Sequence, residues 1–456
     1  MPSATAPRPG NHPLLSGPIL PTLLKLSAPN VLAMTMAVAV GVAETWYIGL
    51  LGTGPLAAMA LVFPFNMLTQ MLSSGAMGGG VSSAVSRALG ADDDARARTL
   101  AFHATVIGAI AGLVYTFLFL TFGPALYAML GGKDQVLADA VAYGGTLFCG
   151  ATLVWLMNAL ASVVRGTGNM RVPSVTILIT SALQILVGGV LCLGLGPAPS
   201  MGLQGIAIGN IVASGVGTAF LLWYLMTGQG RLILRLQGVP LQGGMFADIL
   251  KVGALACLSP LQSVLTTLVF TGFIARLGTE ALAGYGIGQR LEFMLIPIAF
   301  GIGVASVPMV GMAVGAGQVP RARRVAWIAG GVSAVNLGVV GLIVSLMPEV
   351  WSGLFSKDAQ VLASASQYLS LAGPAFPLFG FGLTLYFASQ GSGKVLGPVM
   401  AATLRLILVI AVGSWLSNSA PEAWHYYALV AGAMATYGLA TAAAIWMTPW
   451  GNGVRS

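Results

Sequence analysis

The sequence predicts an all-α integral membrane protein with twelve transmembrane helices. Three observations support this prediction: only 7% of the residues are charged while 57% are hydrophobic, the apolar residues form long runs, and short stretches of sequence recur at a constant spacing. A soluble domain normally carries roughly a quarter charged residues. A spanning helix needs ~20 mostly apolar residues, and these runs are too long, with too little alternation, for barrel strands.

The spans are delimited by charged residues and by Gly/Pro clusters. In the first half the separators are LGTGP, RALGADDDAR, GPALYAMLGGKDQ, RGTGNM and GPAPSM. In the second half they are LGTE, VGAGQVP, PEVWSGLFSKDAQ, GSGKV and NSAPEA. Between the halves lies GQGRLILRLQGVPLQGG, at 228–244. The predicted spans are 19–50, 56–86, 97–122, 136–164, 171–195, 202–227, 245–276, 281–313, 321–347, 361–390, 396–417 and 424–448.

The basic residues predict the orientation. If the N-terminus is cytoplasmic, fifteen of the twenty Lys and Arg residues fall on the cytoplasmic side, three fall outside, and two lie within spans. By the positive-inside rule both termini then lie in the cytoplasm. We therefore expect cytoplasmic tails at 1–18 and 449–456. The first of them lacks the basic-then-apolar order of a cleaved signal peptide.

The chain repeats itself. LLGTGPLA at 50–57 matches RLGTEALA at 276–283, RALGADDDARAR at 87–98 matches MAVGAGQVPRAR at 312–323, and GTGNMRVPSV at 166–175 matches GSGKVLGPVM at 391–400. The three matches thus occur in the same order and at a nearly constant offset. An even number of spans gives both copies the same orientation, which is a parallel repeat of the kind found in transporters. We predict an N-lobe at 19–227, an inter-lobe linker at 228–244 and a C-lobe at 245–448.

The sequence resembles the multidrug and toxic compound extrusion (MATE) transporters over roughly residues 20–448. The resemblance is carried by AETWYIGLLGTGPLAAMAL, GGGVSSAVSRALGADDDARAR, RGTGN and YGIGQRLEFMLIPIAFGIG. It implies two six-helix lobes that form a V around a central cavity. It also implies export of amphipathic, often cationic compounds in exchange for H⁺ or Na⁺.

Between Lys25 and Arg87, Glu44 is the only residue among Asp, Glu, Lys, Arg and His. A carboxylate at a helix centre costs ~2.5–3.5 kcal/mol on insertion scales, so such a residue marks a proton or ion path or reaches to interfacial water. In the MATE family an acid followed by Thr occupies this point, and Glu44-Thr45 matches with Glu instead of the usual Asp. Pro29 matches a proline that the family uses to bend this helix. The resemblance favours Glu44 as the proton carrier.

Amide side chains are the candidate neighbours of Glu44. Archaeal and DinF-type members carry Asn and Asp four residues apart in the span at 171–195, where this chain has Gln184 and Gly188. The Thr of the following span corresponds to Asn210. Gln184 and Asn210, together with Asn158, are candidates for neutral hydrogen bonds around Glu44, although buried amides also serve as plain interhelical contacts.

The second half departs further from the family. NorM-type members carry acids where this chain has Gln262 or Ser263 and Phe379, so the pattern is closer to the DinF type. In place of those acids, Glu292, Arg290 and Arg405 lie within spans. Residues two apart on a helix do not face each other, so Arg405 is the better candidate partner of Glu292 than Arg290. Such a pair is either functional or a structural buried ion pair.

These features predict a monomeric multidrug antiporter of a bacterial cytoplasmic membrane. It would carry drugs or dyes and contact lipid but not nucleic acid, and it would use H⁺ or Na⁺ as coupling ion with no cofactor and no metal. The alternative is a flippase for a lipid-linked oligosaccharide, which would need more in-span basic residues than Arg290 and Arg405. An enzyme is not predicted, because no cluster of His, Cys or Asp supplies a nucleophile, a base or metal ligands.

Overall fold

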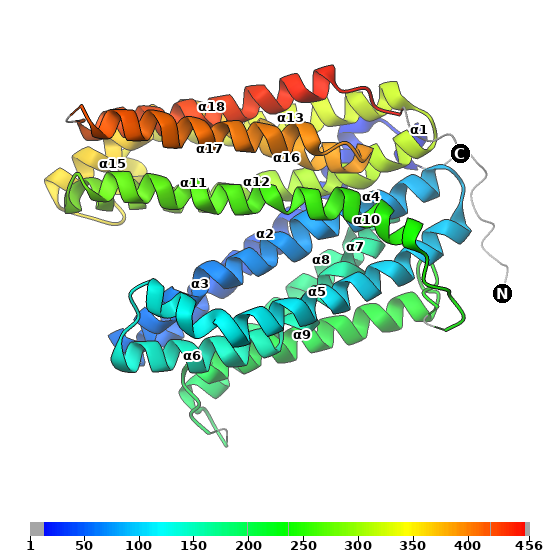
Figure 1. The fold of residues 1–456 in the computed structure, drawn as a ribbon, viewed down its shortest axis with the longest axis horizontal. Helices are drawn as coiled ribbons and strands as arrows, with labels where there is room; N and C mark the ends of the chain where they lie inside the picture. Colours follow the sequence, from blue (N-terminus) through cyan, green and yellow to red (C-terminus); the bar gives the residue numbers. More distant parts are fainter. Residues whose placement is uncertain (1–12, 198, 236, 420, 452–456) are drawn as a thin grey trace. The chain divides into compact units, whose positions relative to one another are not determined.

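The computed structural model describes residues 13–451 apart from 198, 236 and 420, and the regular elements of that part of the chain are all helices (Figure 1). Contacts divide it into two compact units: Leu32–Gly253, and the residues up to Val31 together with those from Ala254 onward. The boundaries therefore fall inside two helices, α2 (Ile19–Gly49) and α10 (Gly243–Ala256). Residues 1–12 and 452–456 of the predicted tails lie outside the described residues.

The unit at Leu32–Gly253 holds the later part of α2, the first part of α10 and the helices between them. These are α3 (Thr53–Gln70), the π-helix η1 (Met71–Met77), α4 (Gly78–Gly90), α5 (Asp94–Met129), α6 (Asp134–Cys149), α7 (Ala151–Gly166), α8 (Arg171–Leu193) and α9 (Leu203–Met226).

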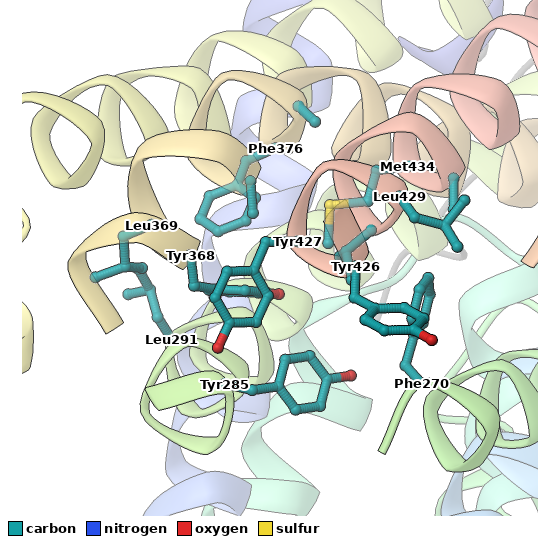
Figure 2. Close-up of a cluster of buried hydrophobic side chains, with 14 of the residues drawn as sticks. Phe270, Tyr285, Leu291, Tyr368, Leu369, Phe376, Tyr426, Tyr427, Leu429 and Met434 are labelled. Carbon is teal, nitrogen blue, oxygen red and sulfur yellow. The ribbon is translucent and has the colours of Figure 1, made fainter. Parts of the chain in front are cut away.

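The other unit holds α1 (Pro13–Ser16), the first part of α2 and the helices after α10. These are α11 (Leu258–Ala275), α12 (Thr279–Gly315), α13 (Val319–Leu346), α14 (Glu349–Ser352), α15 (Ala359–Ala372), the short 3₁₀ turn η2 (Gly373–Ala375), α16 (Phe376–Ser392), α17 (Leu396–Ser417) and α18 (Ala423–Met447). Its core is rich in buried tyrosine and phenylalanine, and Figure 2 shows Tyr285, Tyr368 and Tyr427 together in it.

The predicted spans are confirmed. In the described part of the chain, eleven helices are long and apolar enough to cross a membrane, and the bent pair α6 and α7 makes a twelfth. Their bounds agree with the predicted ones to within a few residues, except that the third helix runs on to Met129. It continues because Pro124 is accommodated inside α5 rather than ending it.

The internal repeat extends to the backbone. Three pairs of residues at equivalent positions of the two copies share a positive φ: Gly52 and Gly278 (116° and 117°), Asp92 and Gly317 (58° and 73°), and Gly168 and Gly393 (86° and 77°). Residues in this left-handed region are uncommon outside glycine, although Asp tolerates it. The occurrence of these positive-φ residues at equivalent positions of both halves therefore confirms the repeat that the sequence predicts.

The fourth span of each copy breaks at the same place. The α6–α7 pair bends by 41° at Gly150. The 3₁₀ turn η2 interrupts the corresponding span of the second copy, and its last residue, Ala375, is the repeat equivalent of Gly150. A Cβ at Gly150 would collide with the side chain of Ile211 on α9, so the close approach of α9 requires glycine there. The sequence did not reveal this break, because the apolar run continues through it.

Arginines anchor the beginning of the first helix of each copy. Arg87 and Arg96 both pair with Asp248 of α10, at 2.7 and 2.8 Å. Arg321, which is the equivalent of Arg96 in the second copy, donates instead to the carbonyl oxygens of Leu14 and Gly17, at 3.1 and 2.5 Å. Arg96 and Arg321, which occupy the same position in the two copies, thus bind two different kinds of acceptor: a side-chain carboxylate in one copy, and backbone carbonyl oxygens within and just after α1 in the other.

Helices α8 and α9 approach each other at glycines. A Cβ at Gly209 would lie 2.7 Å from Cα of Gly188, whereas a Cβ at Gly188 would have its nearest neighbour, Ile206, at 3.6 Å. Gly209→Ala is therefore expected to push the helices apart and to destabilise the protein by about 1 kcal/mol. Gly188→Ala is the matched control and should be tolerated. The check is the temperature at which each detergent-purified variant loses its monodisperse peak; equal temperatures would contradict the expected difference.

Candidate coupling site

Glu44 lies five residues before the end of α2, within the unit at Leu32–Gly253. Its side chain is buried, with 7% exposed. Gln184 of α8 donates a hydrogen bond from Nε2 to Glu44 Oε1 at 2.7 Å. The structure thus brings together the acid and the first of its predicted amide neighbours.

Helix packing holds Gln184 in this position. Gln184 precedes Gly188 by one helical turn, and the close approach of α9 at Gly188 fixes α8 on that side. On α2, the ring of Tyr47 packs against Gly189, where a Cβ would lie 2.7 Å from Cζ of the tyrosine. Thr45 faces away, with an exposed hydroxyl that donates to the Gly41 carbonyl oxygen at 2.7 Å. Only the acid of the Glu-Thr pair therefore enters the buried contact.

The other two amides do not join this pair. Asn210 is buried, with 6% exposed, and forms no hydrogen bond with Glu44 among the contacts of the described residues. Asn158 of α7 donates from Nδ2 to Ser73 Oγ at 2.8 Å and approaches Gln70 Oε1 at 3.4 Å. It thereby links α7 to the π-helix η1, a type of turn that is frequent at functional sites.

Pro29 lies inside α2, which stays helical from Ile19 to Gly49. The next residue, Asn30, donates from Nδ2 to the carbonyl oxygen of Gly301 at 3.1 Å. The boundary between the two compact units follows directly, between Val31 and Leu32. Pro29 therefore stands next to the point where α2 passes from one unit to the other, and its role in bending the helix stays a prediction.

Glu292 belongs to a second cluster, in the other unit. Tyr368 of α15 donates its hydroxyl hydrogen to Glu292 Oε1. The rings of Tyr285 and Tyr427 stand edge-on to Tyr368, with centroids 5.4 and 5.3 Å away (Figure 2). Tyr427 in turn donates to the carbonyl oxygen of Ala281 at 3.0 Å. A carboxyl group here sits at the edge of an aromatic wall rather than beside a cation.

Arg405 interacts electrostatically with Glu292 but does not reach ion-pair distance in this conformation. Its guanidinium lies over the rings of Phe379 and Tyr437, 5.6 and 5.8 Å from their centroids, and its buried Nε has no hydrogen-bond partner among the described residues. The aromatic faces therefore provide the favourable contacts of this cation.

The remaining candidates lie apart from both acids. Arg290 stacks over the ring of Phe355, 5.2 Å from the centroid. Gln262 donates from Nε2 to Thr403 Oγ1 at 2.7 Å, which joins α11 to α17. Both contacts are compatible with a structural role, and neither places the residue next to Glu292.

Two tyrosines were missed by the sequence reasoning. Tyr368 binds Glu292, and Tyr143 of α6 interacts electrostatically with Glu44. Tyr143 and Tyr368 occupy equivalent positions of the two copies, whereas Glu44 and Glu292 do not. Among the contacts of the described residues, Tyr368 is the one of the two tyrosines that forms a hydrogen bond with its acid. Aligning the two halves over their full length would have found them, because the three stretches that reveal the repeat do not include this region.

Known proteins match over most of the chain. A protein named FAD transporter from Shewanella oneidensis is 25% identical over 412 residues, 89% of this chain and 91% of that protein. A probable multidrug resistance protein NorM from Thermotoga maritima is 26% identical over 392 residues, 84% and 82% of the two chains. A solved structure of a MOP superfamily transporter from Pyrococcus furiosus superposes with a TM-score of 0.87 at 22% identity, over 95% of this chain and 96% of that chain.

The family model named MatE matches the chain twice, over residues 29–190 and 256–415. The two matched stretches fall in the two copies of the repeat that the backbone geometry also shows. The likeness to the Pyrococcus furiosus structure confirms the all-α, twelve-span fold. The chain therefore belongs to the MatE family, the MATE transporters, and is a multi-pass membrane transporter and not an enzyme.

Proposed function

We propose that this transporter is a secondary antiporter that exports amphipathic cations in exchange for H⁺. The observation that carries the proposal is the buried Glu44 carboxyl group, held by Gln184 inside a bilayer-spanning helix. A carboxyl group in that environment is costly unless it functions as an ion or proton site. The Thermotoga maritima relative, named as a probable multidrug resistance protein, supports drugs or dyes as the substrate class.

The groups around the Glu44 carboxyl group favour H⁺ over Na⁺ as the coupling ion. A hard cation prefers several oxygen ligands. The contact recorded for the Glu44 carboxyl group comes from an amide N–H, which offers no lone pair, and Gly188 supplies no second carboxylate. A single carboxyl group can still bind one proton on one side of the membrane and release it on the other as access alternates. Drug export would then be driven by the return of that proton.

The membrane placement follows from the basic residues. With fifteen of the twenty Lys and Arg residues on one side of the predicted spans, the positive-inside rule supports cytoplasmic termini. The Shewanella oneidensis and Thermotoga maritima relatives come from bacteria, which supports the bacterial cytoplasmic membrane. We expect the transporter to act as a monomer.

A second candidate substrate is an anionic aromatic dinucleotide. The Shewanella oneidensis relative is named FAD transporter, and the Arg405 guanidinium lies among aromatic faces with an unpartnered Nε. Guanidinium groups suit phosphate, and aromatic rings suit a planar flavin. The lipid-linked flippase alternative would need more basic residues within the spans than Arg290 and Arg405 supply.

Purified protein in proteoliposomes tests these candidates. Ethidium and FAD would be offered separately, with an H⁺ gradient, a Na⁺ gradient or neither. We expect uphill ethidium movement driven by H⁺ alone. Uphill FAD movement without ethidium movement would replace the proposed substrate class. No movement of either compound under any gradient would contradict drug antiport and direct the test to lipid-linked substrates.

A further inference from the structure

A cavity of about 500 Å³ opens in the unit at Leu32–Gly253, at the end of α6 that carries its first residues. Leu51 and Pro55 line it beside the α2–α3 turn, Asp139 and Tyr143 line it from α6, and residues 200–204 line it before and at the start of α9. By the positive-inside rule this end faces the outside. The cavity therefore lies on the side from which a coupling ion would arrive.

The rim of this cavity is fixed by hydrogen bonds. Ser200 Oγ donates to the carbonyl oxygen of Cys192 at 3.4 Å, and the Met201 N–H donates to that of Leu191 at 2.8 Å. Gly194 ends α8 with a φ of +67°, which turns the chain back over its own last turn. The segment beside the cavity is thus anchored to α8, the helix that carries Gln184.

A polar stripe runs along α6 into the cavity. Gln135, Asp139 and Tyr143 follow each other at intervals of four residues, so they lie on one face of the helix. Gln135 donates from Nε2 to Asp139 Oδ1 at 2.8 Å. Asp139 is the one acid among the lining residues, and no described Lys or Arg lies within ion-pair distance of it. Its negative charge is therefore available to a cation in the cavity.

The inner end of the stripe reaches the neighbourhood of Glu44. Tyr143 lines the cavity, yet only 3% of its surface is exposed, and it interacts electrostatically with Glu44. Cys192, which anchors the rim, does so as well. In the other repeat the equivalent Tyr368 donates directly to a carboxyl group. Tyr143 therefore belongs both to the lining of the cavity and to the electrostatic surroundings of the coupling carboxyl group.

We propose that this cavity is the outer access site of the coupling cation, a monovalent ion that Asp139 attracts and that reaches Glu44 past Tyr143. The proposal rests on the proposed antiport function, because it assigns a path to the ion that Glu44 carries. A focused negative charge in a cleft raises the local concentration of a cation and the rate at which it binds. The substrate path is not part of this assignment.

The test compares Asp139→Asn with Asp134→Asn in proteoliposomes. Asp134 is exposed on the first turn of the same helix but does not line the cavity, and Asn tolerates its positive φ of 47°. Initial rates of dye export would be measured against the external H⁺ concentration without Na⁺, and against external Na⁺ at fixed pH. For the ion that drives export, Asp139→Asn should raise the half-maximal concentration about threefold to tenfold and leave the maximal rate unchanged. Asp134→Asn should match wild type.

A second measurement tests the access site without relying on the correct folding of Asp139→Asn. Gln204→Cys places a thiol on the exposed rim, with the accessible Cys149 and Cys257 replaced by Ser and the buried Cys192 kept. A cationic thiosulfonate reagent should raise the half-maximal concentration, and an anionic one of similar size should not. Equal effects of the two reagents, or an Asp139→Asn curve that equals the Asp134→Asn curve, would overturn the access site. If Glu44→Gln still couples transport, the proposed antiport function itself fails. The failure of the access site and the failure of the proposed function are therefore distinguished by different variants.

Discussion

Glu44→Gln is expected to abolish uphill export of ethidium while the protein still reaches the membrane at the wild-type level. Glutamine keeps the size of the side chain and its capacity to accept from Gln184 Nε2, but it cannot bind and release a proton. The measurement is ethidium accumulation in a pump-deficient bacterial host, at matched membrane levels. Accumulation should rise to that of the host without transporter, and the residual flux should not respond to a protonophore.

Two variants separate coupling from local structure. Thr45→Val removes the neighbouring hydroxyl, which faces away and donates only to Gly41, so export should stay at the wild-type level. Gln184→Met removes the donor to Glu44 and should give a partial loss, because a buried carboxyl group without its hydrogen bond is less well positioned. Dye binding to purified Glu44→Gln, followed by fluorescence polarisation, should persist. Uphill export by Glu44→Gln would rule out Glu44 as the coupling residue.

Most of the fold could be predicted from the sequence, because a bilayer imposes long apolar runs and because the chain is repeated. What the sequence could not show is where a run is broken without a change of composition. At the bend, Gly150 lies so close to Ile211 of α9 that a Cβ would collide with it, and this is a tertiary contact that the sequence does not show. The π-helix η1 likewise lies inside one predicted span. Its Ser73 accepts a hydrogen bond from Asn158, a contact that the sequence does not show.

The acidic residues of the candidate site could be predicted from the sequence, but the residues that contact them could be predicted only in part. An intramembrane Glu is conspicuous in any sequence, and Gln184 followed from its position in the family pattern. The position of Arg405 within a span indicated a pair with Glu292; the two side chains interact electrostatically, while the guanidinium lies over Phe379 and Tyr437. Side-chain direction across three packed helices depends on rotamers and helix rotation, which residue spacing does not specify. The hydroxyl donor to Glu292, Tyr368, is one of many aromatic residues in the apolar runs.

Glu292→Gln is expected to destabilise the protein by about 2 kcal/mol, chiefly through Arg405. The two side chains interact electrostatically although they are not in direct contact, and Arg405 has an unpartnered Nε. Without the negative charge of Glu292, the guanidinium would retain only its aromatic contacts. The measurement is the thermal denaturation of purified protein in detergent, compared with Tyr368→Phe, which removes the donor to Glu292 but leaves both charges.

The double variant Glu292→Gln with Arg405→Met decides whether the charges are coupled. If Arg405 needs Glu292, removing both charges should recover much of the stability that the Glu292 change alone loses, with a coupling energy on the order of 1 kcal/mol or more. Strictly additive effects would show that the aromatic faces of Phe379 and Tyr437 suffice for Arg405. In that case Glu292 would be free to change its charge during transport without cost to the fold. A coupled pair would instead tie the charge state of Glu292 to the stability of its unit, which is the behaviour expected of a structural ion pair.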